Sequence, residues 1–213
     1  GIAPSVGPYH RQMEGVHFFS SGKADLVDRM ASIYSYVRTY AQVDEVMVCA
    51  ARNGSVDKFN KLMASKNWDK AKRLGLYAKV FPGDPVICTK HQYASSLFIG
   101  TLGVLRDIDD EILIAWDGDG IDQETGRTAL RGVPPEVSID IKLAYAITCH
   151  KSQGSSARVV IVALEDTKLL TREWLYTAIT RATHQVIIVG QREHLNYAIQ
   201  RRTSRMTGFR IEA

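Results

Sequence analysis

Residues 148–154, with the sequence Thr-Cys-His-Lys-Ser-Gln-Gly, place a hydroxyl, an imidazole, an ammonium and an amide between two apolar runs. Side chains of these types donate hydrogen bonds to phosphate oxygens, and a glycine lets a backbone approach a ligand closely. The segment therefore predicts a site for a phosphate chain. A solvated surface turn has the same composition, so the prediction needs a second segment that agrees with it.

Residues 175–183, with the sequence Leu-Tyr-Thr-Ala-Ile-Thr-Arg-Ala-Thr, provide that second segment. The apolar spacing predicts a helix over 172–183 in which Trp174, Thr177 and Arg181 share one face. An arginine at a helix end is either a solvated cation favoured by the helix dipole or a planar fork directed at a phosphoryl group. Its occurrence together with the polar segment favours the second interpretation.

Helix and strand signals alternate in the flanks of the chain and predict the elements that would position these side chains. Their order implies a largely parallel sheet covered by helices, with ligands bound beyond the carboxyl ends of the strands. The predicted helices are 24–40, one that Ser55 caps, 172–183 and 192–202, and the predicted strands are 46–50, 143–148, 158–163 and 185–189. We expect Ser20 and Ser21 to cap the first helix.

The middle of the chain, from about Ala78 to Asp140, differs from the flanks. Short strand candidates are separated there by turn signals such as Pro82-Gly83-Asp84 and the Asp-Gly repeats near residue 118. Such spacing predicts a small antiparallel barrel or hairpin array. The simplest architecture is therefore one α/β domain interrupted by a small β insertion.

Composition limits the class of protein. The 213 residues are 45% hydrophobic and 23% charged, which is typical of a globular protein, and no apolar run is long enough for a membrane span. The N-terminus has no secretory pattern, so a cytoplasmic location is the default expectation. The net charge of +4 suits an anionic partner without requiring one. Cys49, Cys88 and Cys149 lack metal-ligand spacing and predict buried free thiols, with no metal site.

The two polar segments also carry a family resemblance. Residues 144–162 (AYAITCHKSQGSSARVVIV) and 169–190 (LLTREWLYTAITRATHQVIIVG) resemble motifs V and VI of superfamily 1 helicases, in the RecD-like branch. Residues 46–63 (VMVCAARNGSVDKFNKLM) are similar to motif IV. Residues 81–105 (FPGDPVICTKHQYASSLFIGTLGVL) resemble the segment that opens the family's small barrel, although Ile99 stands where the family has asparagine.

The resemblance implies a fold and a function. The implied fold is a RecA-like parallel sheet with helices on both faces, the motor domain called 2A, at 1–77 and 142–213, interrupted at 78–141 by an SH3-like β-barrel called 2B. The implied function is that of the C-terminal part of an ATP-dependent DNA helicase or translocase, like the RecD α subunit of exodeoxyribonuclease V, which tracks 5′ to 3′ on single-stranded DNA. The sequence contains neither a GxxxxGK[ST] loop nor an acidic magnesium strand. We therefore expect ATP and Mg²⁺ to be bound mainly by a first motor domain, and this chain alone to be inactive.

The resemblance also assigns residues. Arg181 would be the motif VI arginine at the γ-phosphate, and Arg52 would assist it from motif IV. The residues implied near the nucleotide are Gln153, Gly154 and Ser156. The residues implied on the nucleic acid are Thr148, His150 and Lys151. Apart from the resemblance, Thr89, Lys90, His91 and Tyr93 at the barrel entrance could offer phosphate contacts and one stacking ring. The implied partners are single-stranded DNA, an N-terminal RecA-like motor domain and subunits of a nuclease complex, with no membrane.

Two alternatives stay open at this point. The chain could be a non-catalytic nucleic-acid-binding or subunit-docking module that keeps the motor fold, although such a module has no need of arginines directed at a nucleotide. Tyr93 could equally be a stacking ring for a base or part of the barrel core.

Overall fold

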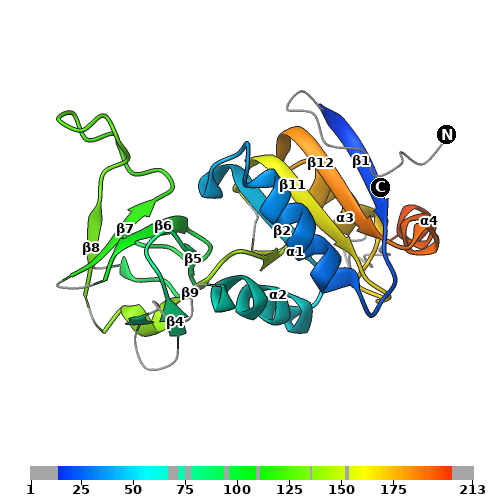
Figure 1. Cartoon of the computed structure of the whole chain (residues 1–213), viewed down its shortest axis with the longest axis horizontal. Coiled ribbons are helices and arrows are strands. Elements are labelled where there is room, and N and C mark those ends of the chain that lie inside the picture. Colours follow the sequence, from blue (N-terminus) through cyan, green and yellow to red (C-terminus); the bar gives the residue numbers. More distant parts are fainter. Residues whose placement is uncertain are drawn as a thin grey trace, which may run out of the picture.

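The structure, a computed structural model, describes residues 14–66, 72–74, 78–93, 96–108, 111–134, 136–151 and 154–202. Two units follow one another along the longest axis of the molecule (Figure 1). We call them the parallel-sheet unit, formed by residues 14–66 and 144–202, and the insertion, formed by the described residues between 72 and 143.

A five-stranded sheet, in which every pair is parallel, forms the centre of the parallel-sheet unit. Its central strand has the sequence ARVVIVAL, and Val160, Ile161 and Val162 are completely buried. A continuous run of β-branched residues is typical of a parallel strand that is covered on both faces. The strand order is β1 (Gly15–Ser20), β12 (Ala182–Gly190), β11 (Ala157–Leu164), β2 (Val46–Ala50) and β10 (Ile147–Thr148).

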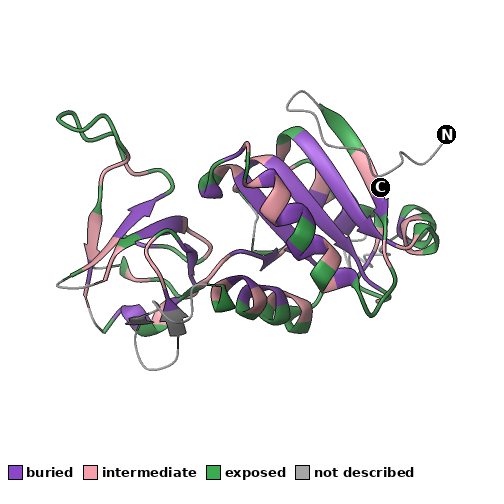
Figure 2. Ribbon diagram, in the orientation of Figure 1, coloured by how far each residue is buried: buried purple, intermediate pink, exposed green. Residues whose placement is uncertain are grey.

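Helices cover both faces of this sheet, as the alternation of elements predicts (Figures 1 and 2). Along β11, Val159 and Ile161 pack into the apolar cluster of one face, and Val160 and Val162 pack into that of the other. The first cluster includes residues of α1 (Leu26–Val37) and α2 (Asn53–Ser65), and the second includes residues of α3 (Arg172–Ile179) and α4 (Arg192–Gln200). The predicted α/β class is therefore confirmed.

Several predicted helix ends are wrong. The cap of α1 is Asp25 rather than Ser20 or Ser21, and it makes no side-chain capping bond. The cap of α2 is Arg52, so Ser55 lies inside the first turn. Helix α3 ends at Ile179, because Thr180 is its C-cap and β12 begins two residues later. The predicted helix to residue 183 is thus too long.

The insertion is an antiparallel sheet with its own apolar core, as the turn signals predict. Leu97, Leu105, Ile114 and Trp116 are among its fully buried side chains. Its strand order is β8 (Arg131–Val133), β7 (Ile112–Trp116), β6 (Leu102–Asp107), β5 (Pro85–Cys88) and β9 (Ile141–Leu143), and β3 (Lys72–Leu74) pairs separately with β4 (Ala78–Val80). The predicted strand 143–148 is therefore split, since β9 belongs to the insertion and β10 to the parallel sheet.

The return segment between β9 and β10 is held firmly from both units. Asn60 of α2 donates from Nδ2 to the carbonyls of Leu143 and Ala146, each at 3.1 Å, and its Oδ1 accepts from the Ala146 N–H at 2.7 Å. The Tyr145 hydroxyl donates to Oδ1 of Asp84 in the insertion at 2.5 Å. Burial raises the pKa of the Asp84 carboxyl, and the bond from Tyr145 partly opposes that rise. Hydrogen bonds from both units therefore fix the conformation of the segment that connects them.

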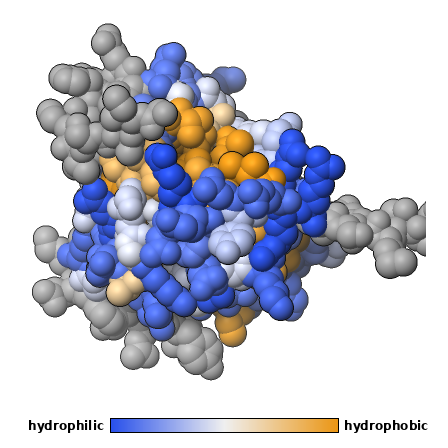
Figure 3. All heavy atoms as spheres, turned by 90° about the vertical axis from the view of Figure 1, so that its right-hand side faces the viewer, coloured by the Kyte–Doolittle hydropathy of each residue, from blue (hydrophilic) through white to orange (hydrophobic). Residues whose placement is uncertain are grey.

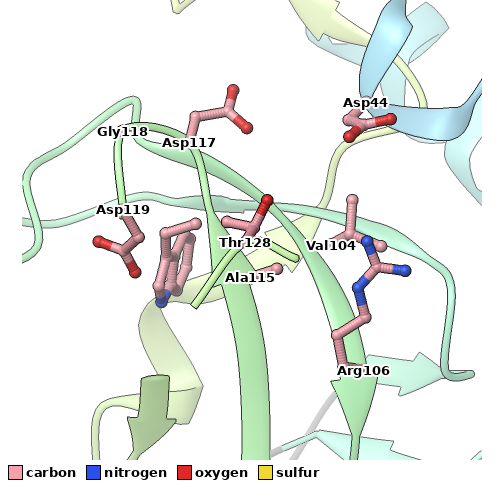
Figure 4. A pocket seen from close by; sticks show the side chains of 9 residues that line it. Asp44, Val104, Arg106, Ala115, Asp117, Gly118, Asp119 and Thr128 are labelled. Carbon is pink, nitrogen blue, oxygen red and sulfur yellow. The ribbon is translucent and has the colours of Figure 1, made fainter. Parts of the chain in front are cut away.

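A cavity of about 240 Å³ opens between the two units (Figure 4). Asp44 lines it from the 3₁₀ helix η1 (Val43–Glu45), and Asp117 and Arg106 line it from the insertion. Loss of hydration and then the negative charge of Asp44 raise the pKa of the Asp117 carboxyl from 3.8 to about 6. The ionised form of Asp117 is thus disfavoured in the folded chain.

The described residues contain no helix that is long and apolar enough to cross a membrane, and no group of His, Cys, Asp or Glu in them is arranged to hold a metal ion. Cys49, Cys88 and Cys149 are buried, as predicted, and none of the three forms a disulfide.

Replacing Ile161 by Ala should lower the free energy of unfolding by about 2–5 kcal/mol, because a fully buried side chain would leave a cavity between the two helix layers. Urea denaturation measures the change. Ile199→Ala on α4, where the side chain is 52% exposed, is the matched control and should change stability by less than about 0.5 kcal/mol. Equal effects at the two positions would contradict the central placement of β11.

Replacing Asp117 by Asn should stabilise the chain at pH 8 by up to about 1 kcal/mol, a small effect because solvent screens this exposed group. Because the pKa of Asp117 is raised, ionised Asp117 destabilises the folded wild-type chain above about pH 6. This loss of stability is absent below pH 3.8, the pKa of the group in the unfolded chain. The difference between variant and wild type, measured by urea denaturation, should therefore shrink as the pH falls towards 4. Asp57→Asn on α2 is the control. A gain in the free energy of unfolding of Asp117→Asn that does not vary with pH would refute the raised pKa of Asp117.

Candidate nucleotide and nucleic-acid site

Arg181 lies at the amino end of the parallel sheet, between α3 and β12. Ala157 and Ala182 are partners in register, and the Ala157 N–H donates to the Arg181 carbonyl at 2.9 Å. The half-buried guanidinium donates from Nη1 to the Ser155 carbonyl at 3.3 Å. Its Nε is buried and has no partner among the described residues. Arg181 is thus fixed by a carbonyl and keeps a polar group that an anion could satisfy.

The end of the 149–156 loop lies beside Arg181. Gly154 has a φ of +95°, and a side chain added there would meet nothing within 4 Å, so the backbone is open to a ligand. Ser156 is exposed and directly precedes β11. Gln153 lies outside the described residues. The structure thus brings Arg181, Gly154 and Ser156 together, as the sequence predicts.

Thr148 lies at the opposite, carboxyl end of the sheet. It is level with Ala50, the last residue of β2, and a turn follows in which the Lys151 N–H donates to the Thr148 carbonyl at 2.9 Å. His150 and Lys151 are exposed. From the strand register, the 149–156 loop travels roughly 20 Å from the carboxyl end back to the amino end of the sheet.

Arg52 does not lie beside Arg181, so the predicted pairing of the two arginines is wrong. Because β2 and β12 are parallel, the residue that follows β2 lies at the carboxyl end and the residue that precedes β12 lies at the amino end. The length of β11 separates the backbone positions of the two arginines by roughly 25 Å. Arg52 instead shares the carboxyl end with Thr148, and its exposed guanidinium donates from Nη2 to the Asp166 carbonyl.

The insertion reaches the same loop through residues 89–100. A Cβ added to Gly100 would lie 3.4 Å from the Lys151 carbonyl. Lys90 is exposed, and so is Tyr93 at 77%, which excludes Tyr93 from the core of the insertion. Thr89 is half-buried, and both its N–H and its hydroxyl donate to the Asp140 carbonyl at 2.7 Å. Its hydroxyl proton therefore serves the insertion itself rather than a ligand.

Two aromatic residues surround Tyr93, and of these sequence reasoning named His91 but missed Phe98. His91 stacks on Tyr93 with 5.6 Å between ring centroids, and Phe98 meets both rings edge-on at 6.1 and 6.5 Å. We call these three residues the aromatic cluster. The signal in the sequence was an aromatic run within a predicted loop, where rings have no core to enter. Exposed rings next to lysines suit stacking of nucleic-acid bases.

The other end of the molecule, where α4 lies, carries an apolar area among hydrophilic side chains (Figure 3). Val16 of the edge strand β1 and Ile199 of α4 are exposed apolar residues of these elements. Neither residue takes part in the site.

Comparison with known proteins identifies relatives. Residues 143–189 match the model of the UvrD-like helicase C-terminal domain. The RecBCD enzyme subunit RecD of Mycolicibacterium smegmatis is 36% identical over 170 residues, which cover 77% of this chain and 28% of that protein. The ATP-dependent RecD2 DNA helicase of Deinococcus radiodurans is 33% identical over 112 residues, 51% of this chain and 14% of that protein.

A solved structure is also similar. The Pif1 helicase from Bacteroides in complex with ADP-AlF3 and single-stranded DNA matches with a TM-score of 0.46 and 16% identity, covering 84% of this chain and 50% of that one. The chain spans little more than a quarter of the length of the M. smegmatis relative. The predicted resemblance is confirmed by the sequence matches. The chain is homologous to RecD and RecD2 proteins, and it carries at residues 143–189 a UvrD-like helicase C-terminal domain.

Proposed function

We propose that this chain is the C-terminal part of an ATP-dependent DNA helicase or translocase that moves on single-stranded DNA. Domain 2A would comprise residues 1–77 and 142–213, with 2B as the insertion at 78–141. The observation that carries the proposal is the course of the 149–156 loop. It begins at Thr148, among the residues suited to a nucleic-acid backbone, and ends beside Arg181.

The amino end of the sheet is the proposed nucleotide side. The unpaired Nε of Arg181 and the open backbone of Gly154 fit an anionic phosphate. Arg181 would approach the γ-phosphate, and Ser156 and Gln153 would lie near the rest of the nucleotide. Hydrolysis of bound ATP would supply the free energy for movement. Mg²⁺ and most of the nucleotide contacts would come from a first motor domain, because this sequence has no phosphate-binding loop, and the isolated chain should be inactive.

The carboxyl end of the sheet is the proposed strand side. Thr148, Lys151 and Arg52 would bind phosphate oxygens, and His150 would contact a sugar or base. Lys90 and the aromatic cluster would extend the track onto the insertion, where Tyr93 offers an exposed ring face to a base. Arg52, which the resemblance assigned to the nucleotide, is thus proposed to bind the strand instead. Thr89 is left without a proposed contact.

The loop would couple the two sides. Closure of the first motor domain onto Arg181 would move Ser155, whose carbonyl Arg181 holds, and with it the loop that continues to Lys151. A ligand drives such a change only to the extent that it binds one state more tightly than the other. Alternation between nucleotide states would then change the grip on the strand. Subunits of a nuclease complex are further proposed partners, because the RecD relative is named as a subunit of the RecBCD enzyme.

In the intact protein, Arg181→Ala should reduce ATP turnover by a factor on the order of 10³, since an arginine finger stabilises charge in the transition state. Strand affinity should stay within a few-fold of wild type. A coupled ATPase assay and fluorescence anisotropy measure the two quantities, and Arg172→Ala, an exposed arginine at the start of α3, is the matched control.

The same assay separates the motor from a non-catalytic module. A module that only binds nucleic acid or docks a subunit would show no ATP turnover in the intact wild-type protein. Turnover that is normal in Arg181→Ala would remove the finger assignment while leaving the motor proposal in place.

Lys151→Ala should weaken strand affinity and reduce the slope of log K against log salt concentration by about 0.7, the amount expected for one lost phosphate contact on a single strand. The measurement is a titration of labelled oligothymidylate at several salt concentrations. Lys61→Ala, an exposed lysine in α2, is the control. A slope that Lys151→Ala leaves unchanged means that this ammonium does not touch phosphate.

A further inference from the structure

Glu165, the residue that follows β11, is a buried carboxylate for which the proposed function gives no role. It is 6% exposed and lies at the carboxyl end of the sheet, beside the start of α2. Burial of a carboxylate is costly unless hydrogen bonds compensate for the lost hydration. The contacts of Glu165 therefore indicate what it holds in place.

The carboxylate of Glu165 holds the backbone that enters α2, from a neighbouring strand. Its Oε2 accepts from the backbone N–H groups of Ala51 and Arg52 at 2.6 and 3.0 Å, and its Oε1 accepts from the Ser55 hydroxyl. Arg52, the N-cap residue, makes no side-chain capping bond of its own. The two backbone donors lie just before Asn53, the first residue of α2, and a negative charge there suits the positive end of the helix dipole. Glu165 thus fixes the backbone at Ala51 and Arg52 and, through the Ser55 hydroxyl, the first turn of α2.

The next residue holds the side chain of Arg52. The Asp166 carbonyl accepts from Nη2 of Arg52, and the Asp166 carboxylate lies 3.7 Å from the Lys23 ammonium. Residues 165 and 166 therefore fix both the backbone and the guanidinium of Arg52. A guanidinium has several N–H groups, so a bond to one carbonyl leaves donors for a phosphate.

We propose that Glu165 is a positioning residue that orients Arg52 towards the phosphate backbone of a single strand. This inference rests on the proposed function, in which Arg52 belongs to the strand side. Its physical basis is preorganisation, because a long side chain that is already ordered loses less conformational freedom when it binds phosphate.

The test compares charge with geometry at position 165. Glu165→Gln removes the charge but can keep the contacts, with the amide oxygen accepting from the two backbone N–H groups and the amide nitrogen donating to Ser55. Glu165→Asp keeps the charge but withdraws the carboxylate by one methylene from α2. Glu193→Gln, an exposed glutamate in the first turn of α4, controls for the loss of one negative charge.

The readouts are the dissociation constant of the full chain for fluorescein-labelled oligothymidylate and its salt dependence, with urea denaturation to verify folding. Arg52→Ala should weaken binding several-fold and lower the slope by about 0.7. Glu165→Asp should reproduce both changes, and Glu165→Gln should stay close to Glu193→Gln. The double variant Glu165→Asp with Arg52→Ala should bind no more weakly than Arg52→Ala alone, because both substitutions remove the same contact.

The possible outcomes separate the two proposals. The positioning role of Glu165 is wrong if Arg52→Ala weakens binding but Glu165→Asp does not, or if the effects of the two substitutions add. Either outcome leaves in place the proposal that the carboxyl end of the sheet binds the strand. If Arg52→Ala leaves both affinity and slope unchanged, Arg52 does not contact the strand, and the positioning role of Glu165 is refuted as well. If Glu165→Gln loses as much affinity as Glu165→Asp while it remains folded, charge rather than geometry is the cause, which also overturns the inference.

Discussion

Burial of β11 on both faces is the constraint on which the rest of the structure depends. Helices cover the strand above and below, and β12 and β2 flank it, so its position is fixed in three dimensions. The polar residues at the two ends of β11 are therefore also held in fixed positions. Ser155 and Arg181 meet at the amino end, and Glu165 and Arg52 meet at the carboxyl end. A strand that spans the sheet thus holds two separate chemical environments at a constant distance from one another.

The sequence predicted the features that periodicity and apolar runs determine. The strands at 46–50 and 158–163 and the antiparallel character of the insertion follow from patterns that burial requires. The grouping of Arg181 with Gly154 and Ser156 was also predictable, because both segments flank neighbouring strands. These features depend on local sequence and on the parallel order of a few strands.

Other features depend on contacts between distant residues, which local sequence does not encode. Strand β1 escaped prediction because it is an edge strand whose Gly15, Val16 and Ser20 are exposed, so its apolar pattern is weak. In the sequence Glu165 resembles a solvated residue after a strand, and only the approach of the segment that enters α2 makes it a buried hydrogen-bond acceptor. The error over Arg52 has the same origin, since a motif identifies a residue but not the end of the sheet at which its neighbours lie.

The three buried thiols give the chain a set of internal reporters. Cys49 lies in β2, Cys88 in β5 of the insertion, and Cys149 directly after β10, with Sγ of Cys149 placed 3.7 Å from the Trp174 carbonyl. A protected thiol reacts with an alkylating reagent only when the surrounding structure opens, so the reaction rate of each cysteine reflects the opening of its own region. The native chain can thereby reveal, without any introduced label, whether its two units loosen together or independently.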